Sequence, residues 1–420
     1  MTKYQVVPVG AVIQSSQYGL SLPAVTEGTL PIVGMKDIRA GRVVIDPNAK
    51  VNLSADNAAD YLLEDGDILI NRTNSPDLVG KAGIFRGSDK AVFASYLVRL
   101  HLDSRLVAPD YLIQVLTSDP GQQAIRALAT RAVGQANLNP TTFKKHFKIP
   151  LPEIEVQQGI ARLLRTWDAA IEKTEQLIVA RDDQHRALSR ALLFGVKRLE
   201  PGTGAEARQL YSFSVPGDWE IVAIGEIASE LSTTGKSFVG LPVLSCTKHD
   251  GLVESLSYFK RQVFSRDTVR YKLVLRGQFA YATNHLEEGS IGHLDFMDRG
   301  LVSPMYTVFK ATSNKVDDKY LYRLLKTETM RRLFAAWTNS SVDRRGGLRW
   351  PEFARLRIPL PPMSEQRAIS AVLEDSGKET ALLRSQLEAL RSQKRGLMKR
   401  LLTGEWRAPA AAGRGGKGVD

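Results

Sequence analysis

The chain contains 420 residues, of which 43% are hydrophobic, and it carries a formal net charge of +12 at pH 7. This length predicts about two or three domains, and the positive charge favours a polyanionic partner, with nucleic acid ahead of an anionic membrane surface. The single cysteine, Cys246, excludes a disulfide framework, and no run of about 18 apolar residues predicts a transmembrane helix. Because no signal peptide is recognisable either, we expect a cytoplasmic protein.

Residues 1–148 are predicted to form a first globular domain of the α+β class. Short apolar runs bounded by Gly, Asn and Asp predict strands over residues 67–71 and 91–100. A helix is expected over residues 109–128, where a proline and an aspartate suit the first helical turn. The order of the strands in the sheet does not follow from these patterns.

Residues 149–195 are predicted to form a long helix that follows a proline-rich segment and ends at Gly195. Residues at alternating steps of four and three form a stripe with the period of a coiled-coil seam. Its apolar members are Ile160, Leu164, Trp167, Ile171, Ile178, Leu188 and Leu192. Thr174, Arg181 and His185 interrupt the stripe; such polar residues either set the register of the pairing or lie at partly exposed ends of the seam.

Residues 196–217 are predicted to be a linker, and residues 218–357 a second globular domain. Its apolar runs predict strands over residues 278–281 and 306–310. A helix is expected over residues 317–336. Cys246 is expected to be a small strand residue without a catalytic role.

Residues 358–404 are predicted to form a second long helix that ends at Gly404, and residues 405–420 a disordered tail rich in Ala, Gly and Arg. The apolar seam residues of this helix are Ile369, Leu373, Leu383, Leu387, Leu390, Leu397 and Leu401. Polar residues interrupt this seam as well, at Ser376, Thr380 and Lys394.

The second half of the chain repeats the first. The segment I-P-L-P-E-I-E-V-Q-Q-G-I at 149–160 returns as I-P-L-P-P-M-S-E-Q-R-A-I at 358–369, an offset of 209 residues. A period of this length indicates two copies of a whole domain and not a solenoid of small units. Since neither long helix can bury its seam alone, we expect the two helices to pair with each other.

Motifs that carry catalysis are missing from the sequence. No N-P-P-[FY] or D-P-P-Y motif of an amino-methyltransferase, no Walker A motif and no E-x-K motif of a metal-dependent nuclease occurs. The only D-x-K motif, at 317–319, lies at a predicted helix start, where the helix dipole favours aspartate anyway. The six histidines show no metal-ligand spacing. We therefore expect a binding protein with no catalytic residue and no metal site.

Basic and amide side chains gather in the turns of both predicted domains. Arg pairs with guanine and Asn with adenine in the major groove, whereas contacts to phosphates position a protein without reading sequence. The candidate DNA contacts are Lys36, Arg39, Arg42, Asn71, Arg72, Thr73, Asn74, Lys81, Arg131, Gln135, Lys144, Lys145, Lys248, His249, Thr283, Asn284, His285, Arg344, Arg345 and Arg349. Any one of them fits a solvated surface residue equally well, but as a set in repeated loops of a basic protein they favour DNA contact.

The two I-P-L-P…Q…I segments, L-L-T-G-E-W-R at 401–407 and G-D-I-L-I-N-R-T-N from residue 66 resemble the specificity subunit of type I restriction–modification systems. The resemblance covers nearly the whole chain. It is weaker at Glu155-Val156-Gln157, because the second copy, Ser364-Glu365-Gln366, has the commoner form. The resemblance implies two target-recognition domains, each reading one half of a bipartite asymmetric DNA site. It also implies that the long helices form an antiparallel coiled coil, with pseudo-twofold symmetry, that sets the spacing of the halves.

The same resemblance implies the partners. These are double-stranded DNA, two modification subunits that use S-adenosylmethionine to methylate adenine, and two restriction subunits that use ATP and Mg²⁺, so this chain itself needs no cofactor. Three alternatives stay open. The first is a modification-only or other phage-defence assembly with the same subunit, and the second is a coiled-coil scaffold whose domains bind protein. The third is a nuclease that uses Asp317 and Lys319.

Overall fold

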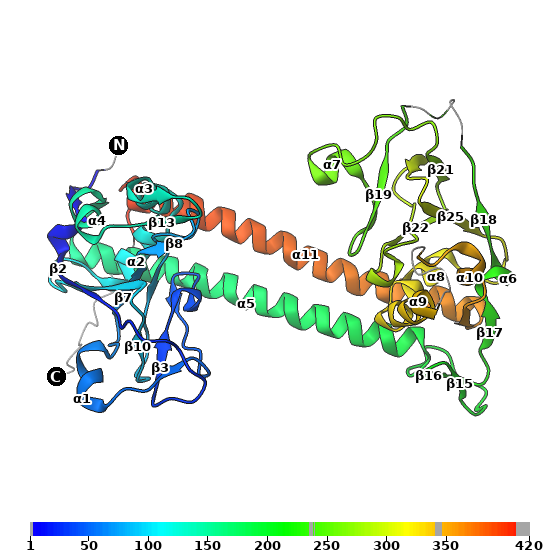
Figure 1. Cartoon of the computed structure of the whole chain (residues 1–420), viewed down its shortest axis with the longest axis horizontal. Helices are drawn as coiled ribbons and strands as arrows, with labels where there is room; N and C mark the ends of the chain where they lie inside the picture. The colour runs from blue at the N-terminus through cyan, green and yellow to red at the C-terminus, as the bar shows by residue number, and fades with distance from the viewer. Residues whose placement is uncertain (1–2, 235–237, 239, 341–346, 409–420) are drawn as a thin grey trace, which may run out of the picture. The chain divides into compact units, whose positions relative to one another are not determined.

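The computed structural model describes residues 3–234, 238, 240–340 and 347–408. The chain divides into two compact units: unit 1 comprises residues 1–176 and 384–420, and unit 2 comprises residues 177–383. Each unit holds one α+β globular domain and one part of each of two long helices (Figure 1). The predicted fold class and the duplication are confirmed. None of the helices in the described part of the chain has the length and apolar composition that crossing a membrane requires.

The globular domain of unit 1 contains short strands and helices. Its strands are β1 (Val6–Pro8), β2 (Ile13–Tyr18), β3 (Leu30–Val33), β4 (Ile38–Arg39), β5 (Arg42–Val43), β6 (Lys50–Val51), β7 (Ile68–Asn71), β8 (Thr73–Asn74), β9 (Ala82–Ile84), β10 (Val92–Phe93), β11 (Leu97–Leu102), β12 (Thr130–Ala132), β13 (Gln135–Asn137) and β14 (Lys148–Pro150). Its helices are η1 (Val9–Val12), η2 (Met35–Asp37), α1 (Ala55–Ala58), η3 (Ala59–Tyr61), α2 (Pro109–Thr117), α3 (Asp119–Leu128) and α4 (Pro140–His146).

A six-stranded sheet with the order β2-β11-β7-β9-β5-β4 forms the centre of this domain. All four residues of β7 are buried, because this strand lies between β11 and β9 in the middle of the sheet. The prediction of one strand over residues 91–100 is wrong. The chain turns at residues 94–97, where the N–H of Leu97 donates to the carbonyl of Ala94, so β10 pairs with β3 while β11 pairs with β7.

The globular domain of unit 2 follows the same plan. Its strands are β15 (Arg208–Leu210), β16 (Phe213–Val215), β17 (Glu220–Ala223), β18 (Ala228–Leu231), β19 (Leu244–Thr247), β20 (Gly251–Glu254), β21 (Lys272–Leu275), β22 (Phe279–Ala282), β23 (Ile291–His293), β24 (Arg299–Val302), β25 (Tyr306–Ala311) and β26 (Arg357–Leu360). Its helices are α6 (Ile224–Ile227), α7 (Ser255–Phe259), η5 (Leu286–Glu288), α8 (Asp318–Leu325), α9 (Glu328–Ser340) and α10 (Trp350–Ala354). The main sheet has the order β18-β25-β22-β23, and Cys246 is a buried residue of β19.

Each of the two helices predicted within the globular domains is in fact a pair of helices. In unit 1 the break lies at Ser118, whose hydroxyl accepts the N–H of Gly121 as an N-cap before a proline. In unit 2 it lies at Thr327, whose hydroxyl accepts the N–H of Met330. A capping residue inside an otherwise helical pattern ends one helix and starts the next, a signal that the predictions over residues 109–128 and 317–336 overlooked.

The long helices are α5 (Ile154–Leu193) and α11 (Met363–Leu402). Both proline-rich segments before them are strands, β14 and β26, and the helices start a few residues later than predicted. Every predicted seam position, apolar or polar, is buried or half-buried, as pairing along this stripe requires. Gly195 and Gly404 follow the helix ends with φ of +71°, the left-handed conformation expected of a glycine that terminates a helix.

The two helices pair antiparallel within each unit. The polar contacts between them are Asp168–Lys394 at 2.5 Å and Glu175–Arg391 at 2.6 Å in unit 1, and His185–Ser376 at 3.0 Å and Arg181–Glu379 at 3.5 Å in unit 2. Residue numbers rise along α5 while they fall along α11, so the predicted antiparallel pairing is confirmed. Several of the polar seam residues therefore contact the opposite helix, which supports a role in setting the register.

The ends of the long helices belong to the domain cores. In unit 1, Ile160, Leu164 and Leu401 are buried in one cluster with the residues of the main sheet. In unit 2, Leu192 and Ile369 have the same role. Because full burial of an Ile or Leu stabilises a protein by about 1.5–3 kcal/mol, the helices are integral parts of the domains.

A buried glutamine holds the start of each long helix to the loop before a helix of its domain. Gln157 accepts the N–H of Ala108 at 2.9 Å and donates to two backbone carbonyls, at 2.9 and 2.8 Å. Gln366 repeats the arrangement with the N–H of Asp317 at 2.8 Å and two carbonyls at 2.8 Å. Both glutamines are fully buried, so the repeated motif around them is a structural anchor.

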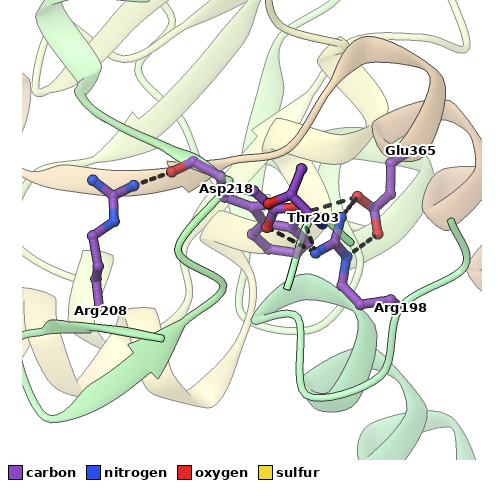
Figure 2. Close-up of polar contacts among 6 residues, drawn as sticks. Arg198, Thr203, Arg208, Asp218 and Glu365 are labelled. Carbon is purple, nitrogen blue, oxygen red and sulfur yellow. Dashed lines mark hydrogen bonds and ion pairs between the residues drawn. The ribbon is translucent and has the colours of Figure 1, made fainter. Parts of the chain in front are cut away.

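The segment predicted to be a linker, residues 196–217, is an ordered part of unit 2 and contains the hairpin β15–β16. Figure 2 shows Arg198 of this segment between Glu365 and Asp218, with bonds of 2.7 and 2.8 Å to Glu365 and 2.9 Å to Asp218. The indole of Trp219 donates to Glu365, and Arg208 donates to the carbonyl of Trp219. The linker prediction is wrong because an isolated Arg-Leu-Glu-Pro sequence does not reveal acids supplied by distant residues.

Only part of the predicted tail is described. The guanidinium of Arg400 lies 4.5 Å from the ring centre of Trp406, so the start of the predicted tail folds back on the end of the helix. Residues 409–420 lie outside the described part of the chain.

Candidate nucleic-acid interface

In unit 1 the turn after the central strand β7 is joined to the hairpin β12–β13. Strand β8 pairs with β13, and the N–H of Leu138 donates to the carbonyl of Arg72 at 2.7 Å. Gly134, with φ of +72°, makes the tight turn of the hairpin. We call residues 71–74 and 130–138 the first platform. It brings together the predicted candidates Arg72, Asn74, Arg131 and Gln135, of which the last two are exposed strand residues and not loop residues.

Unit 2 contains the equivalent arrangement after its central strand β22. The N–H of Leu348 donates to the carbonyl of Thr283 at 2.9 Å, the counterpart of the bond from Leu138 to Arg72. We call residues 282–285 and 347–349 the second platform. It brings together the candidates Thr283, Asn284, His285 and Arg349, all near the end of β22. The candidates Arg344 and Arg345 lie outside the described residues.

Exposed apolar side chains flank both platforms. The N–H of Arg72 donates to the carbonyl of Tyr96 at 3.0 Å, and its guanidinium lies 4.9 Å from the ring centre of Tyr18. In unit 2 the hydroxyl of Thr283 donates to the carbonyl of Met305, the residue equivalent to Tyr96. Tyr96 is 52% exposed and Met305 is 61% exposed. Apolar groups can contact the methyl group of thymine, so these side chains join the candidates that the sequence patterns missed.

Two segments of the chain, residues 21–180 and 216–392, match the family described as type I restriction modification DNA specificity domain. The chain belongs to this family. Each matched segment includes one platform and part of a long helix, so the internal duplication is a duplication of the family's domain. The protein is a DNA specificity subunit of the type I restriction–modification class.

Relatives of this specificity subunit include two proteins of Methanocaldococcus jannaschii. The MjaX specificity subunit is 24% identical over 398 residues, which cover 90% of this chain and 87% of the relative. The type I restriction enzyme MjaVIII specificity subunit is 25% identical and covers 77% of this chain and 76% of the relative. The fold is similar to the crystal structure of a type I S subunit from M. genitalium, with a TM-score of 0.57, 14% identity and 96% of each chain covered.

Two predicted base contacts of the first platform do not fit their positions. Asn71 is completely buried, and its side-chain amide has no hydrogen-bond partner among the described residues. Thr73 is only 9% exposed. Because a side chain must reach the groove to contact a base edge, burial removes Asn71 and Thr73 from the set of direct base contacts.

Further candidates lie in η2, β4 and β5 of unit 1 and in the turn between β19 and β20 of unit 2. Lys36 pairs with Asp46 at 3.0 Å, and Arg39 is exposed. Arg42 forms an ion pair at 2.9 Å with Glu172 of α5, so it ties its turn to the long helix and is a poor candidate for base contact. In unit 2, Lys248 and His249 are both exposed in the equivalent turn.

Three lysines of unit 1 remain candidates for phosphate contact. Lys81 is half-buried in the turn before β9. Lys144 on α4 donates to the hydroxyl of Ser16 at 3.2 Å, while Lys145 is exposed. Lysines that contact phosphates supply affinity that depends on salt but not on sequence.

The turn that follows the second platform carries two acidic residues that the sequence patterns did not single out. The ligand atoms of His285, Glu287 and Glu288 lie within 4.8 Å of one another, and His285 is hydrogen-bonded to Glu288 at 3.1 Å. Carboxylates accept hydrogen bonds from the amino group of cytosine. We therefore add Glu287 and Glu288 to the candidate DNA contacts. The spacing rules for metal ligands did not detect this group, because its members are close neighbours in one turn.

The residues of the alternative nuclease motif have structural partners. Asp317 caps α8 by accepting the N–H of Tyr320 at 2.8 Å and also accepts the hydroxyl of Ser370. Lys319 forms an ion pair with Glu374 at 2.8 Å. These contacts account for the Asp-Asp-Lys sequence without catalysis.

Proposed function

We propose that the first platform reads one half of a split, asymmetric DNA site and the second platform reads the other half. The observation that carries this proposal is that the two platforms share the same backbone arrangement but present different side chains. Arg72 and Tyr96 stand in unit 1 where unit 2 has Thr283 and Met305. Because each kind of base pair presents a distinct pattern in the major groove, different side chains on one frame select different sequences.

The partners follow from the same duplication. Two modification subunits, one for each copy of the anchored helix, bind S-adenosylmethionine and methylate adenine, one in each half of the site. Two restriction subunits, which use ATP and Mg²⁺, complete the assembly. The duplication of the family's domain supports this stoichiometry, because two equivalent halves of one chain can each accept one copy of a partner.

The decisive experiment is co-expression of this chain with its modification subunit, followed by genome-wide mapping of methyladenine. We expect one split motif with a fixed spacer. An absence of new methylation would contradict the proposal and favour a protein-binding scaffold. Co-expression with and without the restriction subunit then separates a restriction system from a modification-only or other phage-defence assembly.

An exchange of domains tests the division of labour. Replacing residues 1–148 with the first domain of another specificity subunit should change one half of the methylated motif and leave the other half unchanged. A change in both halves would show that the two platforms do not read independently. The reciprocal exchange of residues 218–357 is the matched control.

A further inference from the structure

A single ammonium group holds together two turns of unit 2 that carry candidate DNA contacts. Lys326 lies at the C-terminal end of α8, and its Nζ donates to the carbonyls of Gly289 at 2.7 Å, Lys248 at 2.9 Å and Thr247 at 3.4 Å. An ammonium has three donors and no acceptor, so three converging carbonyls match it fully. Burial lowers the pKa of Lys326 from its ordinary value.

The two turns come from separate parts of the sequence. The first joins β19 to β20 and presents Lys248 and His249; the second contains η5 and presents His285 and Glu288. Their backbones approach each other at Gly289, because a Cβ built on Gly289 would lie 3.3 Å from the carbonyl oxygen of Lys248. We call them the β19–β20 turn and the η5 turn.

Helix α9 adds a second bond to the η5 turn. The guanidinium of Arg331 donates to the carbonyl of Glu287 at 3.2 Å and also pairs with Glu328 at 3.0 Å. Arg331 therefore holds the η5 turn alone, whereas Lys326 holds both turns. The three bonds of Lys326 thus connect the two turns through one side chain.

The first domain has no equivalent of this cation. At the offset of 209 residues, Thr117 stands in place of Lys326 and Gln122 in place of Arg331. Gln122 donates to the carbonyl of Gly80 at 3.1 Å, and Thr117 donates to the carbonyl of Ile113 on its own helix. The neutral side chain of Gln122 thus holds one turn in the first domain, whereas the charged side chain of Lys326 holds two turns in the second.

We propose that Lys326 is a positioning residue for DNA sequence recognition by the second domain, because it fixes the β19–β20 turn and the η5 turn as one rigid surface. Contacts to base edges lose discrimination when the side chains that make them are displaced by about 1 Å. The proposal rests on the assignment of one half-site to each domain. It predicts that removing the ammonium relaxes recognition of the second domain's half-site only.

The test uses the full chain in complex with its modification subunit and DNA duplexes that carry the motif found by methylation mapping. Methylation rates are measured on the cognate duplex and on duplexes with single base changes in either half. For Lys326→Met we expect discrimination against changes in the second domain's half to fall at least tenfold, with discrimination in the first domain's half unchanged. Lys319→Met, which removes the same charge from the same helix, is the control and should leave both halves unchanged.

The remaining outcomes are equally decisive. Unchanged discrimination by Lys326→Met, or equal loss in both halves, would overturn the proposal. If Lys326→Met does not assemble, Lys326→Gln decides, because its amide can retain one or two of the bonds; relaxed discrimination supports the proposal and unchanged discrimination overturns it. Failure of both variants to fold would show that Lys326 supports the domain itself and would also overturn it. The absence of any split motif for the unaltered chain is different, since it contradicts the proposed function and not this inference alone.

Discussion

The long helices are attached to the two domains in the same way. In unit 1, Gln157 anchors the helix through three hydrogen bonds, and Tyr111 donates to the carbonyl of Pro150. In unit 2, Gln366 makes the same three bonds, and Tyr320 donates to the carbonyl of Pro359. The sides of the domains that carry the platforms do not match in this way. Lys326 and Arg331 hold turns of the second domain, and the first domain has the neutral residues Thr117 and Gln122 at these two positions. The comparison shows that the duplication preserves attachment to the helices while the recognition surfaces differ.

One contact departs from the symmetry of the anchors. Glu365, next to the anchoring glutamine, is buried and accepts two bonds from Arg198, but Val156 stands at its place in unit 1. The second unit therefore ties the segment after α5 to the start of α11 by a buried ion pair (Figure 2). These similarities and differences between the two units predict how much each contact contributes to the stability of the chain or to sequence discrimination.

The largest effect is expected from Glu365→Gln. The change removes the charge from a carboxylate that accepts two bonds from Arg198 and one from Trp219, although Arg198 keeps Asp218. Since a hydrogen bond to a charged group contributes about 1.5–3 kcal/mol, we expect a loss of about 3–5 kcal/mol. Urea unfolding of the full chain measures the free energy of unfolding. Glu379→Gln is the control, because the exposed pair of Glu379 with Arg181 is worth less than about 1 kcal/mol. Equal losses of unfolding free energy in the two variants would show that the contacts of Glu365 contribute no more to stability than an exposed ion pair does.

Replacing the anchoring glutamine should lower the free energy of unfolding by nearly the same amount in the two units. Replacing Gln157 or Gln366 with Ala leaves a buried N–H and two carbonyls without their partner, and we expect a loss of roughly 3 kcal/mol in each case. The measurement is unfolding of each single variant, monitored by fluorescence and by circular dichroism. A loss that is several-fold larger in one unit would contradict the equivalence of the anchors.

Alanine substitutions at equivalent positions of the two platforms should reduce sequence discrimination by different amounts. Arg72→Ala removes a guanidinium suited to guanine and should cost about 1–3 kcal/mol of discrimination in the first half-site. Thr283→Ala, at the equivalent position of the second platform, should have a smaller effect and act on the other half-site. Methylation rates on duplexes with single base changes measure both. If Arg72→Ala weakened binding to all sequences uniformly, Arg72 would be a phosphate contact and not a base contact.

Much of the architecture follows from the chain's own repetition. The offset of 209 residues, the stripe from Ile160 to Leu192 and its counterpart from Ile369 to Leu401 predicted two domains and two long helices, and the structure confirms them. The same patterns were less reliable within the domains. They merged β10 with β11 and overlooked the capping roles of Ser118 and Thr327, because a short apolar run does not reveal where a chain turns from one sheet to another.

The recognition surfaces were predicted only in outline. Arg72 and Arg131 were candidates from their residue types, but only the pairing of β8 with β13 places them on one platform. Tyr96 and Met305 were missed, since exposure of a single apolar residue has no signature in sequence. Asn71 was selected by its type and excluded by its burial.

The sequence by itself determined the duplication, the helix seam and the family, because these depend on periodicity and on matched residues at a constant offset. Only the tertiary structure decided which polar side chains hold the fold and which can face DNA. Gln157, Gln366, Glu365 and Lys326 bind groups that are distant in sequence, and a hydrogen bond depends on distance and direction in space. A polar side chain whose donors and acceptors are satisfied inside the domain stabilises it, and one left exposed on a platform is available to a base.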